Sequence, residues 1–189
     1  MSFVKLKTNI IDEGEILFDG KPVTTTGPER IIVFQEGALF PWLKVQDNVE
    51  FGLKMAGIPK EERAQISKRY LDMMQLTKFA DSYTYQLSTG MKPRVAIARA
   101  LINKPKLILA DEPTGNLDTK LSVEIMELLK ELNERDHITI VMVTHEEEMA
   151  AYAHRLIWMV DGRVERTGTP GEVLHVDESG VTVAAGEGA

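Results

Sequence analysis

Residues 107–118 read LILADEPTGNLD, and this stretch carries the first evidence for the fold. Its apolar residues, 107–110, predict a short buried strand that ends in two adjacent carboxylates, Asp111 and Glu112. Ligands of open α/β sheets bind beyond the carboxyl ends of the strands, where an Asp can hold Mg²⁺ and a Glu can polarise a water. On these residues alone, an ordinary solvated acid pair at a strand end is an equally good interpretation.

The sequence on either side predicts a layered α/β structure. Apolar segments at 31–35 (IIVFQ), 138–143 (ITIVMV) and 155–160 (RLIWMV) are typical of strands. Between two of them, 119–135 repeats apolar residues on one helical face. Apolar strands joined by helical crossovers indicate a parallel sheet with both faces covered. Residues 42–90 contain no comparable strand, so they predict a mostly helical insertion.

Three polar residues are candidate helix caps: Asp47, Ser88 and Asp118 each precede a helical pattern. Residues 15–21 (EILFDGK) predict a strand followed by a tight turn.

Composition narrows the class of protein. The 189 residues carry a net charge of −7, which argues against a nucleic-acid partner. The absence of cysteine excludes disulfides and thiolate metal sites. The sequence contains no run of about 18 apolar residues, the length that predicts a membrane-spanning helix. Any association with a membrane is therefore expected to be peripheral.

Three further features stand near predicted strand or helix ends. Gln35 ends the predicted strand 31–35 and offers a neutral amide for Mg²⁺ or water. Residues 87–91 (LSTGM) precede a helix, whose N-terminal N–H groups favour an anion. His145 lies just past the strand 138–143 and could contact a phosphate. Taken singly, each of these three features also has an ordinary structural interpretation: an amide at a strand end, a helix N-cap and a loop histidine.

In their shared order, these features resemble the ATP-binding-cassette (ABC) ATPases, the motor subunits of membrane transporters. The resemblance covers about residues 14–170. It implies a P-loop NTPase-like (RecA-like) parallel sheet core with a helical subdomain, Mg²⁺ and ATP as cofactors, and ATP hydrolysis coupled to transport. The first half is similar to nitrate, sulfonate and taurine importers, and the second half to lipoprotein and macrolide exporters.

The resemblance also implies a role for each matching residue. Gln35 is expected to bind Mg²⁺ and sense the γ-phosphate, Asp111 to hold Mg²⁺, Glu112 to act as general base and His145 to act as the switch histidine. A second group is expected to meet nucleotide held by the opposite subunit or to lie at the dimer interface: Ser88, Thr89, Gly90 and Asp118.

Domain boundaries and partners follow from the same resemblance. The core is expected at 1–35 and 91–168, the helical signature subdomain at 36–90 and a C-terminal tail at 169–189. The expected partners are a second ABC ATPase subunit, identical or different, and transmembrane permease subunits that dock on 36–90. The expected location is the cytoplasmic face of the cell membrane.

The sequence departs from the family pattern in two places. No glycine begins the phosphate-loop pattern G-x-x-x-x-G-K-[ST], which predicts an N-terminally truncated cassette whose sheet lacks the phosphate-loop strand. In the family, that strand lies between the strands that match 138–143 and 155–160. Without it, the edges of these two strands that would face it are expected to be unpaired. In the signature, Thr89 and Pro93 replace the usual Gly and Gln. With Ser88 as N-cap, Pro93 would strain the helix; if the helix starts one or two residues later, this strain nearly vanishes.

These departures leave the enzymatic activity of the chain open. One alternative is a non-catalytic subunit that lends Ser88 and Gly90 to a competent partner. Another is a truncated product with no independent function.

Overall fold

The computed structural model describes residues 14–35 and 38–174, and the elements below belong to these residues. The strands are β1 (Leu17–Phe18), β2 (Lys21–Pro22), β3 (Arg30–Val33), β4 (Leu107–Asp111), β5 (Thr139–Val143), β6 (Leu156–Val160) and β7 (Arg163–Gly168). The α-helices are α1 (Val45–Val49), α2 (Phe51–Met55), α3 (Lys60–Met73), α4 (Met91–Leu101), α5 (Thr119–Asp136), α6 (Glu147–Ala150) and α7 (Pro170–Val173). Short 3₁₀ turns at Thr77–Phe79 and Thr84–Gln86 connect α3 to α4.

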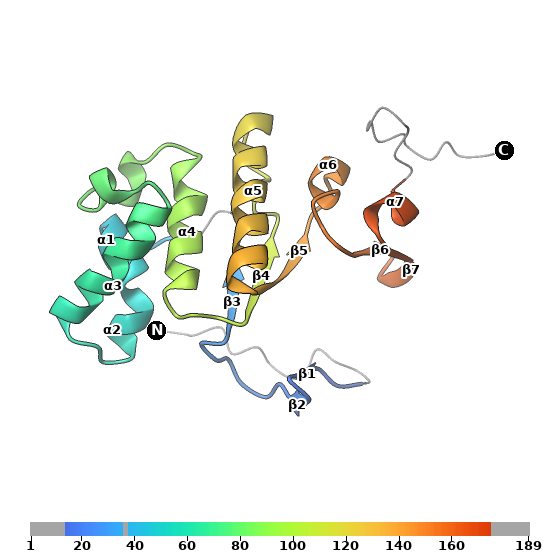
Figure 1. Cartoon of the computed structure of the whole chain (residues 1–189), viewed down its shortest axis with the longest axis horizontal. Coiled ribbons are helices and arrows are strands. Elements are labelled where there is room, and N and C mark those ends of the chain that lie inside the picture. Colours follow the sequence, from blue (N-terminus) through green and yellow to red (C-terminus); the bar gives the residue numbers. More distant parts are fainter. Residues whose placement is uncertain (1–13, 36–37, 175–189) are drawn as a thin grey trace.

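Three strands form the parallel sheet in the order β3-β4-β5. Ile108 pairs with Ile31 on one side and with Ile140 on the other. These side chains face the core, where α4 contacts β3 and α5 contacts β5 (Figure 1). Side chains alternate along a strand, so Ile32 and Val141 point to the opposite face, where they are 37% and 50% exposed. The predicted parallel α/β core is therefore confirmed, but the prediction that helices cover both faces is wrong for the described residues, where the face with Ile32 and Val141 stays exposed.

The far edge of β5 matches the expectation of an unpaired strand. No ladder joins β5 to β6 in the described part of the chain, and β6 pairs instead with β7 in an antiparallel ribbon. The apolar side chains Val143, Ile157 and Met159 are each about 60% exposed on these two strands.

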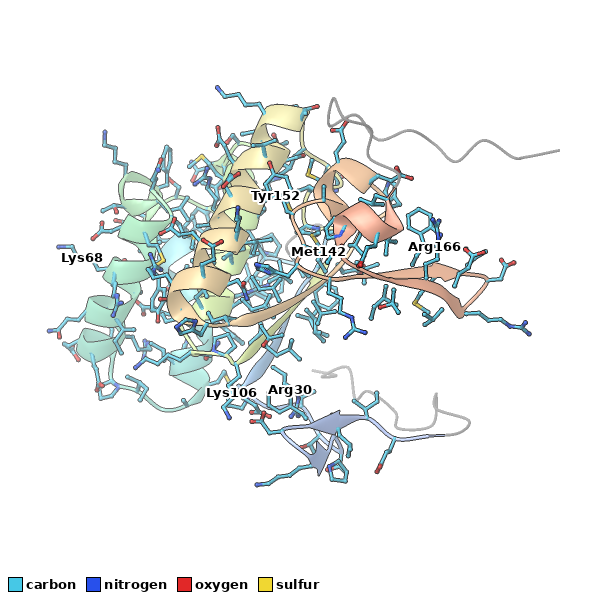
Figure 2. The ribbon with its side chains drawn as sticks, turned by 45° about the vertical axis from the view of Figure 1, so that its right-hand side comes forward. Arg30, Lys68, Lys106, Met142, Tyr152 and Arg166 are labelled. Atoms are coloured by element: carbon cyan, nitrogen blue, oxygen red, sulfur yellow. The ribbon has the colours of Figure 1, made fainter. Side chains whose placement is uncertain are left out.

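The β1–β2 hairpin lies near the amino ends of β3 and β4. Its strand and tight turn were predicted. Lys106, just before β4, bonds through Nζ to Asp19 Oδ2 at 2.6 Å. The Arg30 guanidinium lies 5.1 Å from the centroid of the Phe18 ring, on the same side of the sheet as Lys106 (Figure 2). These contacts fasten the hairpin to the amino ends of β3 and β4.

The segment 42–90 is mostly helical, as predicted, but α1 begins two residues before Asp47. Lys44 is the N-cap, and no side chain caps this helix. The reason is Asn48, which is fully buried and whose amide accepts from Phe40 N–H and donates to the Phe40, Leu43 and Lys44 carbonyls. A buried amide that satisfies four backbone groups places the helix start more firmly than an exposed cap.

The predicted N-cap at Ser88 is wrong. Helix α4 begins at Met91 with Gly90 as N-cap, and the Ser88 carbonyl accepts from Met91 N–H at 3.1 Å. Pro93 is therefore the third helical residue. The first N–H groups of a helix have no partner within it, so the expected strain from Pro93 disappears.

The first residues of the predicted C-terminal tail, 169–174, include a short helix. Helix α7 packs on β7, and Val173 is 2% exposed. Arg166 in β7 stacks on the Trp158 ring and donates to the Val173 carbonyl at 3.0 Å (Figure 2). Residues 169–174 thus belong to the folded part of the chain.

None of the helices described here is long and apolar enough to cross a membrane.

Candidate functional site at the carboxyl ends of the sheet

Three predicted site residues follow adjacent parallel strands. Gln35 comes two residues after β3, Glu112 directly after β4 and His145 two residues after β5. Parallel strands end at one edge of a sheet, so the order β3-β4-β5 brings the three residues to that edge with Glu112 in the middle.

Glu112 is held in an uncommon backbone conformation. Its φ is 42°, in the left-handed region that non-glycine residues rarely adopt. Its N–H donates to the Val143 carbonyl at 2.9 Å, which continues the β4–β5 pairing by one residue. Such strain persists where surrounding contacts over-determine it, often at functional sites. The bond to β5 thereby aims the Glu112 side chain toward the residues that follow β5.

The Glu112 carboxylate pairs with His145. Oε1 lies 2.9 Å from His145 Nδ1, and the side chains are 28% and 72% exposed. The hydrogen bond and negative charge of Glu112 raise the pKa of His145 above its usual value of 6.5. The pair therefore favours the imidazolium, with Nδ1–H donating to the carboxylate and Nε2–H left to face solvent or a ligand.

Gln35 joins this cluster through Gly115, a residue that sequence reasoning missed. A Cβ placed on Gly115 would lie 2.6 Å from Gln35 Nε2 and 3.2 Å from Glu112 Oε2. The Gln35 amide and the Glu112 carboxylate therefore both lie against the bare Gly115 backbone. The sequence offered only a glycine in a turn, which does not reveal what approaches it.

Thr114 was also missed. The residue is 1% exposed, and its Oγ1 has no hydrogen-bond partner within the described residues. An unpartnered buried hydroxyl is uncommon, and this one stands in the loop that carries Glu112.

Asp111 is the last residue of β4 and is exposed. Across residues 14–35 and 38–174, no group of three or more His, Asp or Glu side chains is placed to hold a metal ion. A cation at this edge would therefore need further oxygen ligands in addition to one or two acidic side chains.

The remaining predicted residues gather at the starts of α4 and α5. Ser88 and Thr89 are exposed, whereas Gly90 is buried against Leu121. The predicted cap at Asp118 is confirmed: its Oδ1 accepts from Leu121 N–H at 3.0 Å. No hydrogen bond between described residues links this second group to Gln35, Glu112 or His145, so the structure forms two separate clusters.

Comparison with known proteins identifies the family. The family model described as "ABC transporter" matches residues 2–115. The chain belongs to the ABC transporter family.

Relatives of this chain include two proteins that are named as ATP-binding proteins. A putative ATP-binding protein of Brucella abortus (strain 2308) is 45% identical over 165 residues, which cover 87% of this chain and 62% of that protein. The nitrate import ATP-binding protein NrtD of Synechocystis sp. is 42% identical over 150 residues, covering 79% of this ABC chain and 56% of NrtD. The chain thus spans less than two thirds of the length of these relatives.

Solved structures confirm the cassette fold. A dimeric post-hydrolysis state of an ATP-binding cassette bound to ADP and Pi superposes with a TM-score of 0.72 at 39% identity, over 84% of this chain and 74% of that one. The structure of cbiO1 from Clostridium perfringens, part of the ABC transporter complex cbiONQ, gives 0.78 at 35% identity, over 86% and 68%. The predicted P-loop NTPase-like fold is therefore confirmed.

Proposed function

We propose that this chain is the ATP-binding and ATP-hydrolysing subunit of an ABC transporter, coupling Mg·ATP hydrolysis to transport across a membrane. The observation that carries the proposal is the convergence of Gln35, Glu112 and His145 at the carboxyl ends of adjacent strands, with the 2.9 Å Glu112–His145 contact. Family membership supports the same activity.

In this proposal Glu112 is the general base. Its carboxylate can accept a proton from a water placed for in-line attack on the terminal phosphorus of ATP. His145 holds the carboxylate in place through Nδ1 and presents Nε2–H as a donor to a phosphate oxygen. Gln35 adds an amide beside the Glu112 carboxylate, where it can orient the same water.

The residues present suit Mg²⁺. This ion prefers oxygen ligands and is usually bound by one or two protein groups together with waters and substrate phosphates. Asp111 and the Gln35 carbonyl would hold it, which agrees with the lack of a larger acidic cluster among the described residues. When bound, Mg²⁺ supplies positive charge that neutralises the phosphate oxygens.

We further propose that the active form is a dimer of cassettes joined to permease subunits. Exposed Ser88, Thr89 and Asp118 are available to a second cassette. The segment 36–90 would serve as the helical subdomain that docks on the permease, residues 1–35 and 91–168 as the core and 169–189 as a C-terminal extension. Such a complex would place the chain on the cytoplasmic face of the membrane.

The test measures ATP binding and hydrolysis by the full chain with Mg²⁺. Glu112→Gln should lower kcat by about 10² to 10⁴-fold and leave nucleotide binding in place, because a general base contributes on that order. Glu134→Gln, an exposed carboxylate on α5, is the matched control and should behave as wild type. Equal activity of Glu112→Gln and wild type would refute the assignment of the base.

The same variants distinguish the alternative in which this subunit lends its signature to a partner. Hydrolysis would then appear only after a second cassette is added. In that mixture Ser88→Arg would abolish activity while Glu112→Gln would have little effect.

A further inference from the structure

The glycine of the signature segment, Gly90, has an ordinary backbone conformation. Its φ is −70° and its ψ −17°, which any residue adopts. A Cβ at this position would lie 2.8 Å from Leu121 Cδ2 and 3.0 Å from Leu121 Cδ1. A Cβ at this position would therefore force the Leu121 side chain to move, because that side chain lies directly on the Gly90 backbone.

Leu121 is also tied to the loop before α5. Its N–H donates to Asp118 Oδ1 at 3.0 Å. One residue thus joins the two loops: its backbone holds the cap of α5, and its side chain rests on the cap of α4.

A second contact one turn further along sets the register of the two helices. Arg94 Nη2 bonds to Glu124 Oε2 at 2.8 Å, and the Arg94 side chain is 18% exposed. Gly90 meets Leu121 and Arg94 meets Glu124 in the same chain order, so α4 and α5 run in the same direction with their starts at one end (Figure 1).

We propose that Leu121 is a positioning residue that sets the spacing between the Ser88–Gly90 loop and Asp118, so that both reach a partner cassette together. This inference rests on the proposed function, in which these two loops face the partner. Loss of the Leu121 side chain leaves both loops intact but lets α4 and α5 shift relative to each other.

The activity test is a space-exchange cycle at positions 90 and 121. Leu121→Ala should lower kcat by about 10 to 100-fold with little change in KM for ATP, because small misplacements of this kind cost that much. Gly90→Ala should be similarly impaired, and the double variant should recover part of the loss because the new methyl fills the space vacated by Leu121. If Gly90 acts only through contact with the partner's nucleotide, Gly90→Ala will be equally harmful in both backgrounds, which would overturn the proposal.

The control is Leu128→Ala on the same helix. Leu128 is partly buried against the core and does not carry a cap. This variant should lose stability and keep kcat, whereas Leu121→Met should retain most of the activity. A parallel fall of kcat in Leu121→Ala and Leu128→Ala would reduce Leu121 to a general packing role.

A distance measurement separates this inference from the proposed function. The chain has no cysteine, so spin labels are attached only at Lys92→Cys and Lys120→Cys, and within one chain they report the α4–α5 spacing. Leu121→Ala should broaden or shift the distance distribution, and Leu128→Ala should not. An unchanged distribution refutes the positioning role even if the wild type hydrolyses ATP. A broadened one supports it even if the wild type does not.

Discussion

Glu50 is expected to be the most sensitive polar residue of the helical segment. It lies between α1 and α2, is 4% exposed and accepts from Gln46 Nε2 at 2.7 Å, Ser67 Oγ at 2.9 Å and Arg63 Nε at 3.2 Å. Arg63 also donates from Nη1 to the Ile58 carbonyl at 2.7 Å, and its side chain is 16% exposed. The carboxylate therefore connects α1 and α2 to α3 through a largely buried charge pair.

Replacing Glu50 by Ala leaves the Arg63 charge and the Ser67 hydroxyl without their acceptor. Removing one partner of a buried ion pair costs about 3–5 kcal/mol. Because Arg63 keeps its bond to Ile58 and some solvent contact, we expect the lower end, about 3 kcal/mol. That is a large share of the roughly 5–15 kcal/mol by which domains are stable.

The assay is urea unfolding followed by circular dichroism at 222 nm. Glu61→Ala, an exposed carboxylate in the first turn of α3, is the control and should stay within about 0.5 kcal/mol of wild type. Glu50→Leu combined with Arg63→Met should recover most of the stability, because apolar replacement of both partners is often neutral. A loss below about 1 kcal/mol for Glu50→Ala would refute the reasoning.

Three further predictions follow from single contacts. The His145 ring should titrate above 6.5 by NMR, and Glu112→Gln should lower its pKa. The stability that this pair contributes is present below the ordinary histidine pKa and is lost as pH rises through the raised one; a His145 pKa at or below 6.5 would contradict the observed contact. Asp118→Ala should destabilise the chain by about 1 kcal/mol in thermal unfolding through loss of the α5 cap, and Asp118→Asn should retain most of it. Pro93→Gln should change stability by less than about 0.5 kcal/mol, because the N–H that Gln would add in the first turn of α4 has no acceptor within the helix. A clear rise in melting temperature would restore the interpretation that Pro93 strains the helix.

The sequence predictions were correct where residues close in the sequence interact and wrong where contacts with other segments decide the structure. Asp118 was assigned correctly because its side chain bonds to a backbone N–H three residues away in the same helix. Ser88 was assigned wrongly because it looked as good a cap locally, whereas the helix starts at Met91, with Gly90 as N-cap against the Leu121 side chain. Asp47 failed for the same reason, since the buried Asn48 amide organises the preceding loop and sets the start of α1.

By itself, the sequence determined the order of strands and helices, because apolar periodicity is a local signal. Its motifs resembled those of the ABC family, and that resemblance predicted Gln35, Glu112 and His145 as site residues. Only the tertiary structure showed the Glu112–His145 bond, the approach of Gln35 to Gly115 and the contact of Leu121 with Gly90. Each of these joins residues distant in the sequence or depends on a missing Cβ. Residue spacing does not encode such contacts, because they arise only when the sheet register and the helix packing bring separate segments together.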